Sequence, residues 1–183
     1  MRVVNTWRNL PGKVWVSMLA LDPRLDKKGE RACRALSPQE QRLFSSMDRY
    51  DRAHSLAVAS RLRDDPLLYR AALLHDCGKL TSELRLWVRW AYTFLEVFQP
   101  RLLARLAEKV EREARGGDVL KRMRSLTPGW RRGLYVQLHH GEVGAALLER
   151  AGSEEEVVRL VRDHQGEPRD DRSRRLRRLD DAL

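Results

Sequence analysis

The chain has 183 residues, of which 42% are hydrophobic and 34% are charged, so it is long enough for one soluble domain with a sizeable core. No apolar run approaches the ~20 residues that a membrane-spanning helix needs, which argues against a membrane protein. The formal net charge of +10 favours anionic partners, although arginine supplies most of the positive charge and codon usage alone can explain such a bias.

Residues 1–47 are predicted to form an N-terminal extension that packs on a helical bundle formed by residues 48–183. The apolar stretch Val14–Leu21 is too short to cross a membrane and is interpreted as a core or docking segment. Ser37-Pro38-Gln39-Glu40 is a capping-box pattern with proline at the first helical position. It predicts a helix that ends near Met47.

The next seventy residues also contain helix signals. Asp-Pro or proline marks the expected start of a helix, and glycine marks the expected end. A stripe of apolar residues at steps of three and four also predicts an amphipathic helix before Pro100. The expected helices run from Asp48 or Asp51 to about Leu62, from Pro66 to Gly78, over 84–98, and from Pro100 to about Gly116.

Residues 115–133 are basic and interrupted by proline and glycine, which predicts a loop that holds at most one short helix. A helix is expected over 142–150, and Ser153 to Glu156 is a second capping-box pattern that opens the next helix. After a polar loop over 165–171, the last helix carries Leu176, Leu179 and Leu183. Strand signals are scarce, so the predicted fold class is all-α.

His75 and Asp76 are adjacent at the end of an apolar stretch, where burial of both is costly unless a partner satisfies them. A divalent metal would do so, because imidazole and carboxylate together suit first-row metals. His54 lies within the preceding helix and has apolar neighbours. Each residue taken singly is more often a core histidine or a helix-end histidine with its counter-charge.

Three later residues complete the set. His140 opens one predicted helix, His164 ends the next, and Asp180 lies on the last helix. Helix ends and one helix interior can converge in a bundle core, which is a usual place for metal sites. The appearance of all these residues together favours a shared metal site over the separate structural roles.

Five sequence blocks occur in this order: Asp51-Arg-Ala-His54-Ser-Leu-Ala-Val-Ala59, Ala-Leu-Leu-His75-Asp76-Cys-Gly-Lys79, His140-Gly-Glu-Val-Gly-Ala145, Asp163-His164 and Leu-Asp180-Asp181. Over roughly residues 48–183 this order resembles the HD superfamily of metal-dependent phosphohydrolases. The His-x-x-x-Gly-Ala block with a later histidine is similar to members that hold two metals, including bacterial symmetrical dinucleoside tetraphosphate hydrolases.

The resemblance implies an HD-domain helical bundle with two divalent ions, iron, manganese or another first-row metal. It implies that the first ion is held by His54, His75, Asp76 and Asp180. Asp76 would bridge to a second ion. The second ion would take His140 and His164, and the catalytic residues would be Asp76 and Lys79, with the lysine near a phosphate. His139 and Asp181 remain open as alternatives to their neighbours.

The expected function is hydrolysis of a phosphoester or phosphoanhydride of a nucleotide-like substrate by a metal-activated hydroxide. Arg131, Arg132 and Arg174 are candidates for binding further phosphates, and a solvated basic face is the alternative for each. A nucleic-acid-binding or nucleotide-sensing protein with a non-catalytic metal is the second hypothesis, since the basic segment around Trp130 could contact a single strand. Oligomeric state is left open. The two cysteines, Cys33 and Cys77, lack metal-type spacing, so a reducing cytoplasm is the simplest setting.

Overall fold

A computed structural model describes residues 10–80 and 86–183, and every regular element in these two ranges is helical. The predicted all-α fold class is therefore confirmed. The helices are α1 (Leu10–Ala20), α2 (Leu25–Ala32), a 3₁₀ turn (Cys33–Ala35), α3 (Pro38–Ser46), α4 (Arg49–Ala59), α5 (Pro66–Leu74), α6 (Leu86–Phe98), α7 (Pro100–Glu113), α8 (Val119–Ser125), α9 (Trp130–Arg150), α10 (Glu155–Asp163) and α11 (Asp171–Asp180). No helix within the described part of the chain combines the length and apolarity that a membrane crossing requires.

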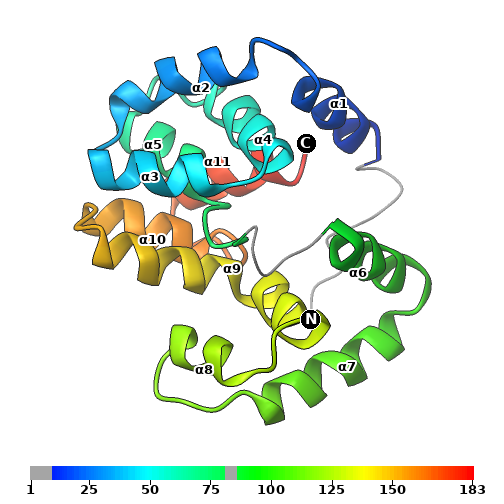
Figure 1. Ribbon diagram of the computed structural model, residues 1–183. Helices are drawn as coiled ribbons and strands as arrows, with labels where there is room; N and C mark the ends of the chain where they lie inside the picture. The colour runs from blue at the N-terminus through cyan, green and yellow to red at the C-terminus, as the bar shows by residue number, and fades with distance from the viewer. Residues whose placement is uncertain (1–9, 81–85) are drawn as a thin grey trace.

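The helices bury two apolar cores that α9 connects (Figure 1). The larger core is formed by α1 to α5, the second half of α9, α10 and α11. The smaller core is formed by α6, α7, α8 and the first half of α9. α9 crosses from one core to the other with a kink at His139, whose φ of −120° and ψ of 19° are not helical.

The N-terminal helices belong to the larger core. Val16 and Ala20 on α1 and Phe44 on α3 are buried in the same cluster as Val58 on α4. Gly12 on α1 lies against the other end of the chain, because a Cβ there would be 2.8 Å from the carbonyl oxygen of Ala182. In Figure 1 the C-terminus accordingly lies beside α1.

Several predicted helix starts agree with the structure. Ser37 caps α3 with the complete capping box, since its hydroxyl accepts from the Glu40 amide and the Glu40 carboxylate accepts from the Ser37 amide. Asp48, rather than Asp51, caps α4, and Asp65 caps α5 ahead of Pro66. The predicted helix over 84–98 appears as α6, while its expected first residues lie outside the described ranges.

Other predicted boundaries are wrong. α5 ends at Leu74 instead of Gly78, because the chain turns there with the Cys77 amide bonded to the Leu74 carbonyl. α4 likewise ends at Ala59, before Leu62, and α11 ends at Asp180, although Leu183 is still buried.

The expected loop over 115–133 contains the one short helix α8, but α9 already begins at Trp130, twelve residues before the predicted start at Glu142. Gly133 is tolerated inside α9 because it is buried there, so packing outweighs its low helix propensity. The second capping box is also wrong. The Ser153 amide bonds to the Leu148 carbonyl and closes α9 after the left-handed Gly152, which is a Schellman turn.

Candidate metal centre

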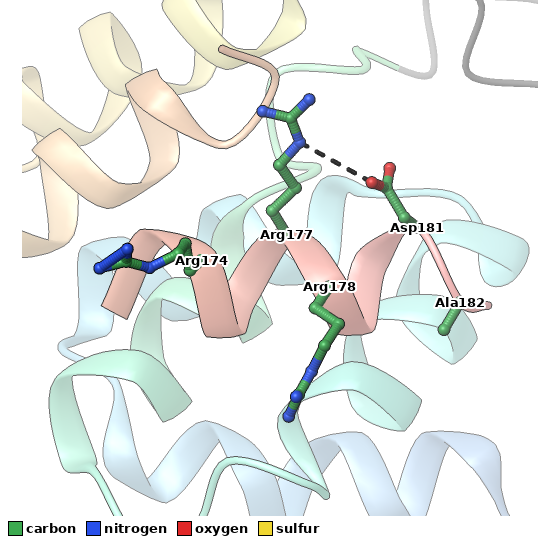
Figure 2. A pocket seen from close by; sticks show the side chains of 5 residues that line it. All are labelled: Arg174, Arg177, Arg178, Asp181 and Ala182. Carbon is green, nitrogen blue, oxygen red and sulfur yellow. Dashed lines mark ion pairs between the residues drawn. The ribbon is translucent and has the colours of Figure 1, made fainter. Parts of the chain in front are cut away.

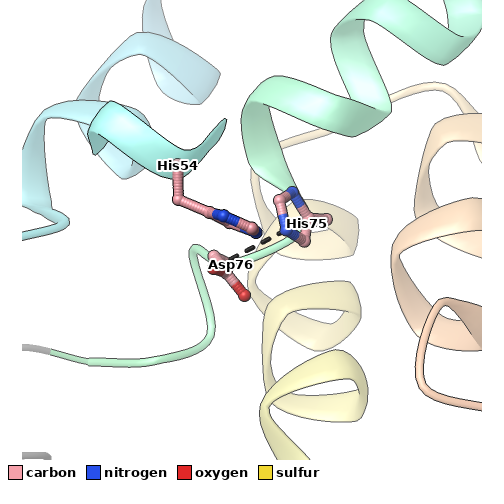
Figure 3. Close-up of side chains that lie close together, drawn as sticks. All are labelled: His54, His75 and Asp76. Atoms are coloured by element: carbon pink, nitrogen blue, oxygen red, sulfur yellow. Dashed lines mark ion pairs between the residues drawn. The ribbon is translucent and has the colours of Figure 1, made fainter. Parts of the chain in front are cut away.

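The first half of the site is formed by α4 and the end of α5. His54 is on the buried face of α4, and His75 is the C-cap residue of α5. Asp76 follows in the turn that ends this helix, and Figure 3 shows the three side chains pointing toward one another. The His75 Nε2 lies 3.6 Å from an Asp76 carboxylate oxygen. Helix termination therefore places both residues of the His-Asp pair against His54.

Asp180 reaches this group from α11. Its Oδ1 lies 2.8 Å from the His54 Nε2 and 3.3 Å from the His75 Nε2. Its neighbour Asp181 instead lies 3.7 Å from the Arg177 guanidinium. Of the two alternatives left open by the sequence, the structure brings Asp180 to the histidines and turns Asp181 away.

The second half of the site is formed by α9 and α10. The His140 Nε2 lies 3.5 Å from the Asp76 Oδ1 and 3.2 Å from the His164 Nε2. His164 is the C-cap residue of α10, and all three residues are buried. Asp76 therefore contacts the histidines of both halves, one oxygen to each side.

Three glycines allow the backbone segments to approach this closely. A Cβ on Gly78 would lie 1.9 Å from the His140 carbonyl oxygen, and a Cβ on Gly144 would lie 3.3 Å from the Gly78 nitrogen. Gly141 is similarly close to α10, because a Cβ there would lie 3.0 Å from the Arg162 carbonyl oxygen. Its amide also donates to the Gln165 side chain at 2.9 Å. Sequence reasoning used these glycines only as part of the motif, not as contact points.

Three of the four clustered histidines share one orientation. The Nδ1 atoms of His75, His140 and His164 lie 2.8, 3.0 and 2.6 Å from a backbone carbonyl oxygen three residues earlier. A carbonyl only accepts hydrogen bonds, so each Nδ1 carries a proton and donates it. Each Nε2 is thereby directed into the cluster, as the outer hydrogen bond of a metal-ligating histidine normally arranges.

Electrostatics divides the histidines into two kinds. Burial works to lower the pKa of His75, but the carboxylates of Asp76 and Asp180 outweigh it and raise that pKa to about 9. Burial lowers the pKa of His140 well below its usual value, assisted by Lys79 and His164. Burial and the positive charge of His75 also lower the pKa of His164. The α9–α10 side of the site is therefore a pair of neutral imidazoles.

The two carboxylates stay ionised despite their surroundings. Burial opposes ionisation of Asp76, but Lys79 and His75 hold its pKa below the usual range. His75 and His54 likewise keep the pKa of Asp180 well below its usual value against the effect of burial. The cluster thus offers negative oxygen atoms and imidazole nitrogens at the same point.

The donor set fits a pair of first-row ions. Atoms bound to one such ion at about 2.1 Å are about 3.0 Å apart at right angles and about 3.4 Å apart at tetrahedral angles. The distances of 2.8, 3.3 and 3.6 Å on one side and 3.2 and 3.5 Å on the other bracket these values. Among described residues, two metal-compatible groups result, His54–His75–Asp76 and Asp76–His140–His164.

The His75 Nε2 atom also supports a metal site. The His75 Nε2 is buried and has no hydrogen-bond partner of acceptable geometry among the residues that the structure describes, although buried polar side-chain atoms are normally satisfied. Its Nδ1 already donates to the Ala72 carbonyl. This nitrogen faces Asp76 and Asp180, so a metal ion among them would take the place of the proton that the two carboxylates favour on His75.

Lys79 and Asp180 form the open side of the site. The Lys79 side chain is 19% exposed and that of Asp180 is 24% exposed, whereas those of His75 and Asp76 are 0% and 2% exposed. The Lys79 ammonium lies 2.8 Å from Asp76 and 3.9 Å from Asp51. Asp51 is completely buried; from the sequence it was considered as a helix start and was not proposed as a site residue. Its position one turn before His54 on the same helix was the available signal.

His139 lies outside the cluster. It is half-buried against Tyr135, with ring centroids 4.5 Å apart, and its two nitrogens face Glu111 and Glu142. The kink in α9 separates it from His140. Of these two neighbours, only His140 reaches the other site residues.

The three arginines considered for phosphate binding have local partners. Arg131 pairs with Glu113 at 3.0 Å and packs on Trp130. Arg132 donates to the Leu126 carbonyl. Arg174 pairs with Asp171 at 2.6 Å. Arg174 also lines a 370 Å³ pocket on α11, but the guanidinium groups in this pocket point in different directions (Figure 2). They do not converge on one anion.

No protein-family model, no curated protein and no solved structure matches this chain in comparisons with known proteins. The case for a function therefore depends on the residues of the site and their geometry.

Proposed function

We propose that this protein is a metal-dependent phosphohydrolase of the HD type, which cleaves a phosphoester or phosphoanhydride bond of a nucleotide-like substrate. One observation carries the proposal. The two oxygens of Asp76 face two different imidazoles, at 3.6 Å from the His75 Nε2 and 3.5 Å from the His140 Nε2. A carboxylate in this position fits a bridge between two ions.

Each residue has a role in this proposal. His54, His75 and Asp180 would hold one ion, and His140 and His164 the other, each ion being iron, manganese or another first-row metal. When bound, two such ions polarise a phosphoryl group and lower the pKa of a water molecule. The outer hydrogen bonds to backbone carbonyls fix the imidazoles before any substrate arrives.

Lys79 supplies a positive charge on the open side of the site. Its ammonium pairs with Asp76 at 2.8 Å, and with metal ions bound at that carboxylate it would be able to contact a phosphate oxygen. Asp51 lies 3.9 Å from the ammonium and would keep it near the site while its contact changes from Asp76 to the phosphate. The lysine would then stabilise the negative charge that develops on the phosphoryl oxygens.

The test combines metal analysis with an activity assay. The purified protein is assayed for phosphate release from nucleotides and dinucleoside polyphosphates, with Mn²⁺ or Fe²⁺ and with a chelator. We expect metal-dependent turnover that His75→Ala and Asp76→Ala each lower by at least about a hundredfold, with unchanged circular dichroism. Unchanged activity in both variants would refute the proposal.

Two other experimental outcomes would indicate a binding protein instead of an enzyme. Tight nucleotide binding with bound metal and no turnover would indicate a nucleotide sensor. Salt-dependent binding of RNA or DNA without turnover would indicate a nucleic-acid-binding protein. Either result would replace the enzymatic proposal.

A further inference from the structure

A second cavity lies on the outer face of α4, apart from the candidate metal centre. It is a groove of about 920 Å³ between α1 and α2 on one side and α5 on the other. Its floor is formed by Ala53, Leu56 and Ala57 on α4 and by the C-cap residue Ser60. These positions follow the i, i+3, i+4, i+7 spacing of a helix-packing face. A different face of the same helix carries His54 into the metal centre.

The walls of the groove are apolar. Leu25 on α2 and Tyr69 on α5 flank the floor, and Trp15 on α1 is 52% exposed at the edge. α1 exposes two further large apolar side chains, Val14 and Met18. Large contiguous patches of exposed apolar surface often mark binding sites. The small floor residues leave room for an apolar ridge to enter.

The rim of the groove is positively charged on both sides. Lys28 and Arg31 lie on the α2 side, and Arg61, Arg63 and Arg70 lie on the α5 side. None of the described residues that line the groove is acidic.

Two of these cations are already neutralised. Lys28 pairs with Asp22, and Arg70 pairs with Glu40. Within residues 10–80 and 86–183, no ion pair involves Arg31, Arg61 or Arg63. An occupant with an apolar face and acidic flanks would therefore satisfy both the floor and the rim.

We propose that this groove binds an amphipathic helix of a partner protein, with its apolar face on α4 and acidic residues on both flanks. In helix-in-groove recognition the bound helix inserts apolar anchors at i, i+3, i+4 and i+7, and the small floor residues Ala53, Ala57 and Ser60 leave space for such anchors. Cations on both rims favour acidic flanks and disfavour basic ones. This proposal is independent of the metal centre and of its chemistry.

The test uses two synthetic helical peptides with the same leucine face, one flanked by glutamate and the other by lysine. Binding to the full-length protein is measured by fluorescence anisotropy at low salt and at physiological salt. We expect the glutamate peptide to bind at least about tenfold more tightly than the lysine peptide, with the difference shrinking as salt is added.

Two variants locate the contact. Ala57→Trp fills the floor and should abolish binding. The triple variant Arg31→Glu, Arg61→Glu, Arg63→Glu should weaken binding of the glutamate peptide at least about tenfold. The matched control is Arg101→Glu, Arg105→Glu, Arg150→Glu, which makes the same change in net charge at exposed positions elsewhere and should not change the affinity.

Three results would overturn the proposal. The first is equal affinity of the two peptides, and the second is unchanged affinity of the glutamate peptide for the Arg31, Arg61 and Arg63 variant. The third is that neither peptide binds the protein. Sedimentation analysis adds a fourth, a dimer that Ala57→Trp converts to monomer, because a second copy of the chain would then occupy the groove. The charge variant keeps the test decisive if Ala57→Trp fails to fold.

Discussion

The Nε2 atoms of His140 and His164 face each other at 3.2 Å, and the Nδ1 of each ring donates to a backbone carbonyl. Both facing nitrogens therefore carry lone pairs, and burial keeps both rings neutral by lowering each pKa. Two lone pairs at this distance repel unless a cation lies between them. The relationship supports a metal site without reference to any sequence motif.

Replacement of His140 tests this site, and its neighbour provides the control. His140→Ala removes a donor from the α9–α10 side, so we expect the metal content to fall from two ions per chain to one. His139→Ala should retain both ions, because His139 faces Glu111 and Glu142. Inductively coupled plasma mass spectrometry of the dialysed proteins measures the difference. Equal metal content in the two variants would contradict the proposed ligand set.

Metal removal should destabilise the fold. An ion that binds only the folded state at a hundredfold excess over its Kd stabilises it by about 2.7 kcal/mol. For a chain of this size, such a gain raises Tm by about 5–11 °C. We expect Mn²⁺ to produce a shift of this order in differential scanning calorimetry and a chelator to reverse it. Asp76→Asn should show no shift, and a shift that persists in this variant would place the ion elsewhere.

Lys79 should have opposite effects on metal-free and metal-loaded protein. Lys79→Met removes the ammonium that neutralises buried Asp76, and loss of one partner of a buried pair costs about 3–5 kcal/mol. In chelator, the variant should therefore unfold at lower urea concentration than the wild type. Mn²⁺ should remove most of this deficit, because the ion replaces the missing charge. Arg112→Met, at an exposed residue on α7, controls for loss of a cation. A deficit that Mn²⁺ does not reduce would contradict this account of Lys79.

The sequence indicated that His75 and His164 lie near helix ends, although it placed the end of α5 at Gly78 and the structure ends that helix at Leu74. His75 and His164 both terminate helices, and proline, capping residues and glycine announce such ends locally. His54 was recognisable because it lies within a predicted helix, has apolar neighbours and precedes the His75-Asp76 pair. The sequence order of these residues therefore indicated which side chains the bundle would bring together.

The choice between His139 and His140 needed the structure. The kink at His139 interrupts the helical phase of α9, and no local residue pattern specifies its angle. The kink occurs where the helix passes from one core to the other. The early start of α9 was missed for a related reason. Gly133 predicts a break, but burial in the tertiary structure keeps it helical. Long-range packing decided both features.

The glycine at position 78 should be indispensable for assembly of the site. A methyl group there would lie 1.9 Å from the His140 carbonyl oxygen and 2.5 Å from the Gly144 nitrogen. Gly78→Ala must push the His75–Lys79 turn away from α9, which should cost about 1–3 kcal/mol or more and weaken metal binding. Urea denaturation and metal titration measure the two effects.

Gly117→Ala is the matched control, since a Cβ on Gly117 would have no neighbour within 4 Å among the described residues. Its stability should stay within about 0.5 kcal/mol of the wild type. Similar losses in the two glycine variants would show that the close approach at Gly78 is not what limits the substitution.

Glu40 should make stability depend on pH in the acid range. Burial alone would raise its pKa, but the Ser37 amide and the Arg70 guanidinium lower it below the ordinary value of 4.5. A carboxyl whose pKa is lower in the folded state stabilises the fold above its unfolded pKa, and that contribution is lost as the pH falls through the folded pKa.

We therefore expect Glu40→Gln to destabilise the fold by about 1–3 kcal/mol at neutral pH. The difference from wild type should shrink below about pH 4.5, because the wild-type carboxyl then becomes protonated and neutral like the amide. Urea denaturation at a series of pH values measures this convergence. Glu30→Gln, at an exposed residue of α2, should follow the wild type at every pH. A Glu40→Gln deficit that stays constant down to about pH 2 would show that the charge of Glu40 does not stabilise the fold, and that its contribution comes from shape and neutral hydrogen bonding alone.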